Sequence, residues 1–108
     1  MAELTYIVTL EKTEEGDLLK IRFGADSQND KKVVDAQAQL EALVESVDLG
    51  GGEVIRVNGP ASLPVAMTIA HAVGHIYQAV ACNDPKVNGN VVAIAHGDKY
   101  AVGQTIPA

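Results

Sequence analysis

The stretch EVIRVNGPASLPVAMTIAHAVGHIYQAVAC, residues 53–82, decides the fold. It opens on a short apolar strand over 53–57 and turns at 58–60, where Asn, Gly and Pro follow one another. Ser62 is a favoured N-cap, so we expect a helix from there to about Gln78. Residues 79–83 then predict another strand. The stretch therefore combines strands and a helix that is apolar on most faces and should be largely covered.

Residues before this stretch predict a hairpin and a first helix. Residues 4–10 alternate in polarity and are rich in β-formers, and 18–23 continue after a turn at 13–17. A helix should run from about Lys31 to Asp48, with Asp30 as its N-cap. Its apolar side chains recur at helical spacing, and three glycines at 50–52 end it: the apolar set is Leu40, Leu43, Val44 and Val47.

The C-terminal part adds one more predicted strand over 91–95. Asn88-Gly89 joins it to the strand before it, and this dipeptide is typical of a β-hairpin turn. The predicted order is thus ββαβαββ within one domain spanning residues 1–108. Two helices and a sheet in so short a chain indicate an α+β, ferredoxin-like two-layer sandwich.

The charge distribution limits the function classes. The net charge is −6, and after Asn58 only Asp84 and Asp98 remain as acids. Non-specific binding of nucleic acid depends on clustered lysine and arginine, so double-stranded DNA and long RNA are poor ligands for this chain. The near-neutral second half, in contrast, tolerates an anion.

The cysteine content and the hydropathy predict a cytoplasmic protein that does not enter the membrane. Cys82 is the only cysteine, so no disulfide forms within the chain, as is typical of a reducing compartment. The N-terminus does not resemble a signal peptide. The most apolar stretch, 61–82, contains a proline and two histidines, which would be costly in a bilayer.

All three histidines lie in the second half of the chain. His71 and His75 are four residues apart on the expected helix and therefore share one face. Together with Asp84 or His96 they offer ligands for Mn²⁺ or Zn²⁺, or groups for acid–base catalysis. The simpler interpretation, a polar residue on the helix flank and a core imidazole, stays open for His71 and His75.

Two loops supply further candidates for binding a phosphate. Asp84-Pro85-Lys86 follows a predicted strand, where a carboxylate can hold a proton or a metal and a lysine can meet a phosphate. Residues 58–62, with Asn58, Gly59 and Ser62, lead from a strand into a helix N-terminus, which favours an anion. Ordinary turns would look the same, so the spacing alone leaves both interpretations open.

The order of these motifs resembles the Csx-three family of CRISPR-associated proteins from type III systems, also described as the third class of ring nuclease. The resemblance covers roughly residues 54–106 and rests on several linked motifs: Asn58 to Met67, Ala70-His71, His75, Ala79 to Ala81, Asp84-Pro85-Lys86, Val91 to His96 and Tyr100 to Gly103.

The resemblance implies a phosphodiesterase that cuts cyclic tetra-adenylate to linear di-adenylates and so switches off antiviral signalling. It also implies a homodimer, with a tetramer or higher assembly around the ligand, and stimulation by Mn²⁺. By match to the family, His75 and Asp84 are the catalytic pair and Lys86 contacts the ring. His71 and His96 align with histidines that have been linked to metal.

The chain departs from the family pattern at a few positions. Lys86 stands where arginine is frequent, which removes a bidentate phosphate contact. His71 lies four residues before His75, and an extra residue lengthens the turn over 87–90. Two alternatives remain: a module that binds the cyclic nucleotide without cleaving it, and a manganese-dependent 3′ exoribonuclease acting as a deadenylase.

Overall fold

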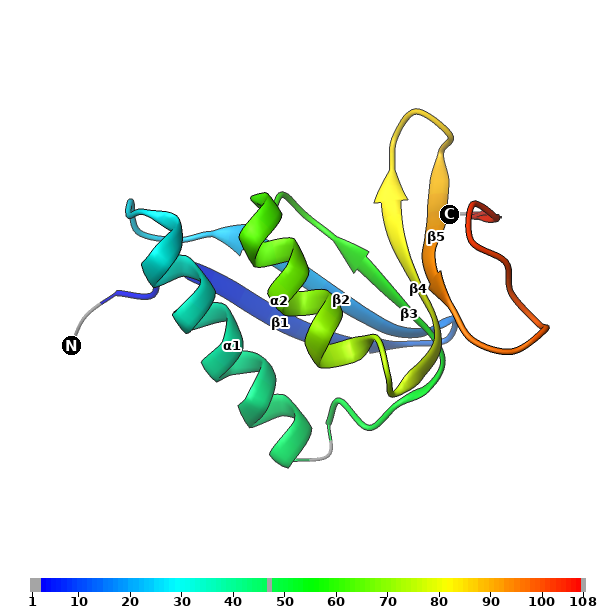
Figure 1. The fold of residues 1–108 in the computed structure, drawn as a ribbon, viewed down its shortest axis with the longest axis horizontal. Helices are drawn as coiled ribbons and strands as arrows, with labels where there is room; N and C mark the ends of the chain where they lie inside the picture. Colours follow the sequence, from blue (N-terminus) through cyan, green and yellow to red (C-terminus); the bar gives the residue numbers. More distant parts are fainter. Residues whose placement is uncertain (1–2, 47, 108) are drawn as a thin grey trace.

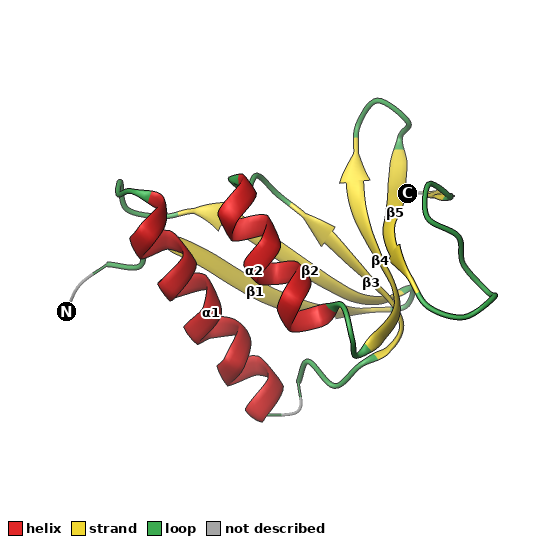
Figure 2. Cartoon of the chain, in the orientation of Figure 1, coloured by secondary structure: helices red, strands yellow, loops and turns green. Residues whose placement is uncertain are grey.

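A six-stranded mixed sheet carries two helices on one of its faces (Figures 1 and 2). The computed structural model describes residues 3–46 and 48–107. Its elements in chain order are β1 Tyr6–Thr13, β2 Gly16–Phe23, α1 Asn29–Glu45, β3 Gly52–Asn58, α2 Leu63–Val73, β4 Tyr77–Asp84, β5 Gly89–Ala95 and β6 Thr105–Pro107. The predicted α+β class and the two layers are therefore present.

The strands are arranged in the sheet in the order in which they occur in the chain, β1-β2-β3-β4-β5-β6. Strand β3 pairs in parallel with β2 and with β4, and the remaining pairs are antiparallel. Both strand–helix–strand units therefore join adjacent strands, whereas the ferredoxin-like fold splits such a unit. The prediction of a ferredoxin-like topology is thus wrong. The predicted order ββαβαββ also lacked β6, which is too short for its periodicity to be read from the sequence.

The main core lies between the helices and strands β1 to β4. Alternate residues of the central strands face the helices, including Leu19, Ile21, Ile55 and Val57. Helix α1 contributes Leu40 at 1% exposure, while Leu43 is half-buried against the core and Val44 is exposed. Val47, the last member of the predicted apolar stripe, lies outside the described residues.

Both helices differ from their predicted bounds. The N-cap of α1 is Gln28, so Asp30 sits inside the first turn rather than at the cap. Helix α2 ends at Val73, five residues before the predicted Gln78. The chain extends instead from Tyr77, because this side chain is buried and its hydroxyl donates to Asp17 Oδ2 at 2.5 Å. A tertiary contact therefore outweighs the helical pattern here.

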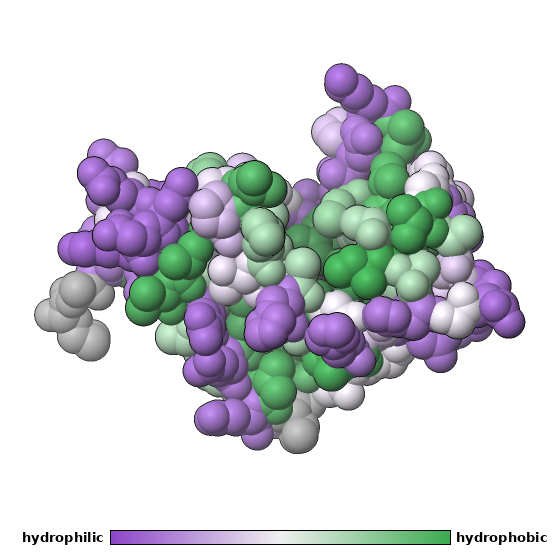
Figure 3. Space-filling view, in the orientation of Figure 1, coloured by the Kyte–Doolittle hydropathy of each residue, from purple (hydrophilic) through white to green (hydrophobic). Residues whose placement is uncertain are grey.

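Helix α2 is also less covered than its composition suggested. Only Val65, Ile69 and Val73 are buried, whereas Leu63 and Met67 are 75% and 65% exposed. The uncovered side faces a groove of about 420 Å³ between α2 and the β4–β5 hairpin, visible as a hydrophobic recess in Figure 3. Its lining includes Ala66, Val80 and Ile94.

Strands β4, β5 and β6 extend beyond the helices, and we call residues 77–107 the wing (Figure 1). A small second core, built from Ala79, Ala81 and Val92 and covered by Tyr100, supports it. The predicted hairpin is present, but its loop spans residues 85–88, because Gly89 already belongs to β5 and pairs with Asp84. Asn88 closes this loop with a φ of 50°. In the described part of the chain, neither helix has the length and hydrophobicity needed to cross a bilayer.

Candidate functional site

His75 is presented by a tight turn between α2 and β4. Gly74 caps the helix by donating its N–H to Ala70 O at 2.7 Å. A side chain at this glycine would lie 2.5 Å from that same oxygen, so the turn requires glycine. His75 follows as an exposed residue, outside the helix. The expectation that His71 and His75 share a helical face is therefore wrong, because the helix ends between them.

His96, at the end of β5, is the residue that the structure brings to His75. The two imidazole rings are 6.3 Å apart between centroids, with an interplanar angle of 24°. His96 Nε2 also lies 2.5 Å from Gly74 O, and the backbone N–H of His96 donates to Gln78 O at 2.8 Å. We call His75 and His96 the histidine end of the molecule. The observed loop over 85–88 produces this pairing: Gly89 pairs with Asp84 and Ala95 with Ala79, so His96 follows beside the start of β4. A two-residue turn at Asn88-Gly89 would place His96 opposite Ala81 instead, so the sequence signal alone did not give this contact.

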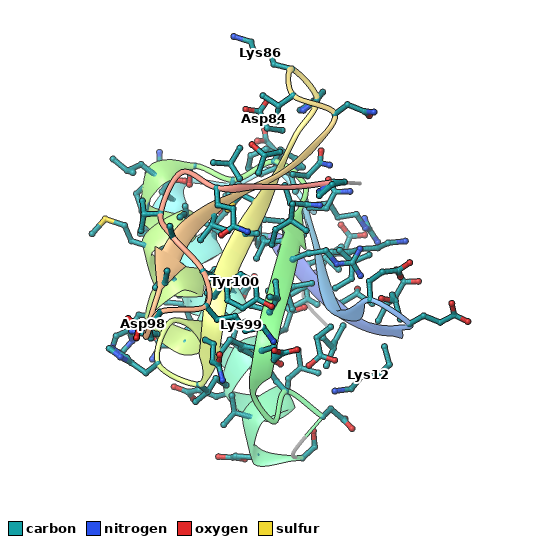
Figure 4. All side chains as sticks on the ribbon, turned by 90° about the vertical axis from the view of Figure 1, so that its right-hand side faces the viewer. Lys12, Asp84, Lys86, Asp98, Lys99 and Tyr100 are labelled. Atoms are coloured by element: carbon teal, nitrogen blue, oxygen red, sulfur yellow. The ribbon has the colours of Figure 1, made fainter. Side chains whose placement is uncertain are left out.

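Asp84 and Lys86 lie at the opposite end of the same strand, on the tip of the β4–β5 hairpin (Figure 4). Asp84 is half-buried, and its Oδ1 accepts the backbone N–H of Lys86 at 3.0 Å. The Lys86 side chain is exposed. The Asp84 carboxylate thus stabilises the turn that presents Lys86, as aspartates often do in turns. Its second oxygen, Oδ2, remains available to a ligand.

The turn over 58–62 lies at this same end of the sheet, because Val57 at the end of β3 pairs with Cys82 near the end of β4. Gly59 has a φ of 138°, and a Cβ there would lie 1.8 Å from Ile21 O, so no other residue fits. The Tyr6 hydroxyl donates to Pro60 O at 2.5 Å and fixes the turn, and burial raises the pKa of Tyr6 to about 12.

Ser62 occupies the predicted N-cap position of α2, but its hydroxyl caps no backbone N–H. Among the described residues its Oγ is buried without a hydrogen-bond partner. The first backbone N–H groups of α2 therefore have no side-chain cap, which leaves them free to meet an anion. We group residues 58–62 with Asp84 and Lys86 as the Asp84 end.

The two ends do not meet within one protomer. Strand β4 has eight residues, the last of which is Asp84, and it spans roughly 23 Å at about 3.3 Å per residue. Figure 4 shows Asp84 and Lys86 at the hairpin tip, well away from Asp98 in the loop that follows β5. His75 and Asp84 of one chain therefore cannot act on the same phosphate.

His71 lies apart from both ends. It is exposed in the last turn of α2 and lines a groove of about 450 Å³ between the two helices, together with Gln37, Glu41 and Met67. Within residues 3–46 and 48–107, no three histidine, cysteine, aspartate or glutamate side chains gather as a metal site. His75 and His96 are the only histidine pair brought together there, and two imidazoles fall short of the three or four ligands of a typical protein metal site.

Cys82 lines the groove beside α2. Partial burial raises the pKa of its thiol, so it is uncharged at neutral pH and is a poor nucleophile. The residue itself is exposed, so it is not a buried part of the core.

Comparison with known proteins adds the family to this geometry. Residues 28–107 match the family model described as CRISPR-associated protein (Cas_csx3). The chain belongs to the Cas_csx3 family. The match runs from the N-cap of α1 to β6 and includes both ends of β4, so every candidate residue lies inside it. No curated protein matches the chain significantly. The resemblance that the motifs indicated is thus confirmed at the level of the family.

Proposed function

We propose that this Cas_csx3 protein is a ring nuclease that cleaves cyclic tetra-adenylate to linear di-adenylates in the cytoplasm and so ends type III CRISPR signalling. One observation supports this most directly: the turn before β4 presents an exposed imidazole, and the far end of β4 and the loop after it present a carboxylate and a lysine. Cleavage of a phosphodiester requires a proton acceptor or donor and a group that offsets charge on the phosphate. Each end of the strand supplies part of this set.

The complete site is formed between protomers. Because the two ends of one chain are roughly 23 Å apart, His75 of one protomer must meet Asp84 of another. Two different surfaces meet in such a head-to-tail contact, which is a heterologous interface and can repeat beyond a pair. When a two-fold homodimer makes this contact with a second homodimer, the junction contains two such sites, so a ring of four nucleotides held there would receive two symmetric cuts. This assembly also explains how a chain of 108 residues can enclose so large a ligand.

The chemical step that we propose is an attack by a ribose 2′-hydroxyl on the adjacent phosphorus. His75 accepts the hydroxyl proton, the 2′-oxygen bonds to phosphorus, and the bond from phosphorus to the 5′-oxygen breaks. The leaving 5′-oxygen takes up a proton, and the product carries a 2′,3′-cyclic phosphate. Asp84 orients a proton within the site. Attack by water is the alternative, and it yields a phosphate monoester instead, so the product's end group distinguishes the two.

Lys86 and the turn over 58–62 bind the ligand in this proposal. The exposed ammonium group of Lys86 offsets negative charge on the phosphate oxygens. Asn58 is exposed at the end of β3, and the backbone of Gly59 and of the uncapped α2 N-terminus at Ser62 can cradle a second phosphate. These residues lie at one end of the sheet, as a ligand that contacts several phosphates requires.

Within the described residues of one protomer, no three potential ligands gather as a manganese site, and His71 lines the separate groove between the helices. We therefore assign no step to the metal and expect cleavage to continue in EDTA. If Mn²⁺ raises the rate, it is bound largely by the phosphates of the ligand. Complete loss of cleavage in EDTA, restored by Mn²⁺, would contradict this assignment.

Single variants test the roles of the two ends. Cyclic tetra-adenylate is incubated with wild type, His75→Ala and Asp84→Ala, and the products are separated by chromatography. Loss of a general base or acid lowers the rate by about 10²- to 10⁴-fold. Undiminished cleavage by either variant contradicts its role. Intact ligand recovered from a tight wild-type complex indicates a binding module, and preference for linear oligo-adenylate indicates the exoribonuclease.

Mixing the two inactive variants tests the composite site. In a head-to-tail contact, His75 of the Asp84→Ala chain meets Asp84 of the His75→Ala chain and restores a complete site. Random mixing at equal concentration should restore about a quarter of the wild-type activity. The control is His75→Ala alone at the same total protein concentration. Failure of the mixture to recover activity would contradict a site shared between protomers.

A further inference from the structure

His96 makes two contacts with the turn that presents His75. Its ring is stacked on the His75 ring, with 6.3 Å between the ring centroids. Its Nε2 lies 2.5 Å from the carbonyl oxygen of Gly74, the residue before His75. The resemblance to the family linked His96 with metal, whereas these contacts are with the protein itself.

The partner of Nε2 determines the tautomer of this ring. A backbone carbonyl oxygen only accepts hydrogen bonds, so Nε2 of His96 must carry the proton and donate it. In the neutral ring, Nδ1 then holds the only free lone pair. His96 is therefore a donor with a fixed orientation, and the nitrogen that faces Gly74 is not available to coordinate a metal.

The turn is held on both sides of His75. On one side, Gly74 O accepts from His96; on the other, Ile76 O accepts the N–H of Gly52 at 3.2 Å, which ties the turn to the start of β3. Within the described residues, no protein group forms a hydrogen bond with the His75 ring itself. The direction of that ring is thus set by its backbone and by the stacked face of His96.

We propose that His96 is a positioning residue for His75: its Nε2–H fixes the Gly74 carbonyl and its ring fixes the plane of the His75 imidazole. The inference rests on the proposed function of His75 as the acid–base group. Acid–base catalysis needs the imidazole within hydrogen-bond reach of the reacting oxygen, and small displacements are costly. Residues of α2, β3 and β5 all meet at this turn, so the wing directly determines the geometry of the catalytic residue.

Two isosteric replacements separate the hydrogen bond from the rest of the ring. Gln places its amide nitrogen near the position of Nε2, whereas Asn places its amide nitrogen near Nδ1 and falls short of Gly74 O. We expect His96→Ala and His96→Asn to lower kcat by about 100-fold with little change in KM. His96→Gln should recover most of the loss. Asp98→Asn, an exposed neighbour on the same loop, is the control and should retain wild-type rates.

The kinetic result has two outcomes that overturn the proposal. Equal loss in the Gln and Asn variants would show that the hydrogen bond to Gly74 O is not what matters. A higher KM for ligand with unchanged kcat would show that His96 binds the ligand instead. Melting temperatures of all variants identify any general loss of folding, and such a variant is then judged by the spectroscopic measurement.

The spectroscopic measurement does not depend on activity. Long-range ¹H–¹⁵N correlation spectra of the wild type report the tautomer of each histidine. We expect the Nε2–H tautomer for His96, and changed ring resonances of His75 in His96→Asn but smaller changes in His96→Gln. The Nδ1–H tautomer of His96 would overturn the proposal even if cleavage is observed. If the wild type does not cleave cyclic tetra-adenylate although His96 is the expected tautomer, the proposed function fails, but the hydrogen bond from His96 to Gly74 O still stands.

Discussion

Two regions of the molecule, the half covered by the helices and the wing, differ in how many large side chains they bury. The covered half, residues 6–73, holds the largest fully buried side chains: Tyr6, Leu19, Leu40, Leu49, Ile55, Val65 and Val73. Among the described residues, the wing contributes only Val92 to this set. Its second core consists otherwise of alanines and half-buried side chains.

Most candidate functional residues show the opposite distribution; the exception is the turn over 58–62, which belongs to the Asp84 end but lies in the covered half. Asp84, Lys86 and His96 belong to the wing, and His75 lies in the turn that enters it. Substitutions in the buried core of the covered half should therefore act on the free energy of unfolding, whereas substitutions at the ends of β4 should act on cleavage. A rigid, well-packed half thus carries a lightly packed half that presents chemistry at its two ends.

The largest expected effect is on the stability of the covered half. Ile55→Ala, at a fully buried position in a central strand, should lower the free energy of unfolding by roughly 2–5 kcal/mol. Val92→Ala, in the small core of the wing, should lower it by about 1–2 kcal/mol. Urea denaturation followed by circular dichroism measures both. An equal or larger loss for Val92→Ala would contradict the division between the halves.

The next effect is on activity at the tip of the wing. Lys86→Ala should lower kcat/KM for cyclic tetra-adenylate by about 10- to 100-fold, because one charge facing the phosphate is lost. Lys86→Arg should retain or raise activity through a bidentate contact. Lys20→Ala is the matched control, since Lys20 is an exposed lysine of β2 that pairs with Glu11 at 2.8 Å. Similar losses in both alanine variants would mean that general charge, and not position, matters.

A smaller effect is expected where the two halves are joined. The Tyr77 hydroxyl donates to Asp17 Oδ2 and connects the start of β4 with the start of β2. Burial, followed by this hydrogen bond to Asp17, raises the pKa of Tyr77, so the phenol remains a donor at all ordinary pH values. Tyr77→Phe should lower the free energy of unfolding by about 1 kcal/mol. A double-mutant cycle with Asp17→Asn measures the coupling, and a coupling near zero would contradict the contribution of this bond.

The smallest effect concerns acid stability of the covered half. Asp35 Oδ2 accepts both the backbone N–H and the hydroxyl of Thr5 at 2.8 Å. The backbone hydrogen bond from Thr5 is the largest cause that lowers the pKa of Asp35 below its usual 3.8. Because the folded pKa is lower than the unfolded one, this carboxylate stabilises the fold above pH 3.8, and the contribution is lost as the pH falls below that value.

The Asp35→Asn variant should therefore be less stable than wild type at pH 7, and the difference should shrink toward pH 3. Thermal melts across this range measure it, and Asp30→Asn, an exposed acid of the same helix, provides the control. A difference that grows on acidification would contradict the direction of the pKa shift.

The sequence predicted the element types because local signals were strong. Alternation marked β1 and β2, and Asn88-Gly89 marked the turn of the β4–β5 hairpin. The prediction that α2 continues to Gln78 was wrong, because Tyr77 is buried against β2 and β3 and residues 77 and 78 belong to a strand. Helical periodicity does not report such a long-range contact. The ferredoxin-like topology was wrong for the same reason. Neighbouring strands in the sheet are chosen by packing, which element order leaves open.

The candidate site was predicted residue by residue but not in its arrangement. The motif resemblance selected His75, Asp84 and Lys86, and the family match confirms only the family from which they were inferred. The prediction that His71 and His75 share one helical face was wrong because α2 ends at Val73. The contact of His96 with the turn at Gly74 depends on the β4–β5 register and was not predicted.

The amino-acid sequence by itself determined the two-layer class, the family and the residue types available for phosphodiester chemistry, because periodicity, turn signals and linked motifs are local properties. Only the tertiary structure decided where those residues lie. An extended β4 holds His75 and Asp84 apart, since a strand cannot bring its own ends together. The same packing places His96 against Gly74, whose carbonyl oxygen accepts the hydrogen bond from His96 Nε2.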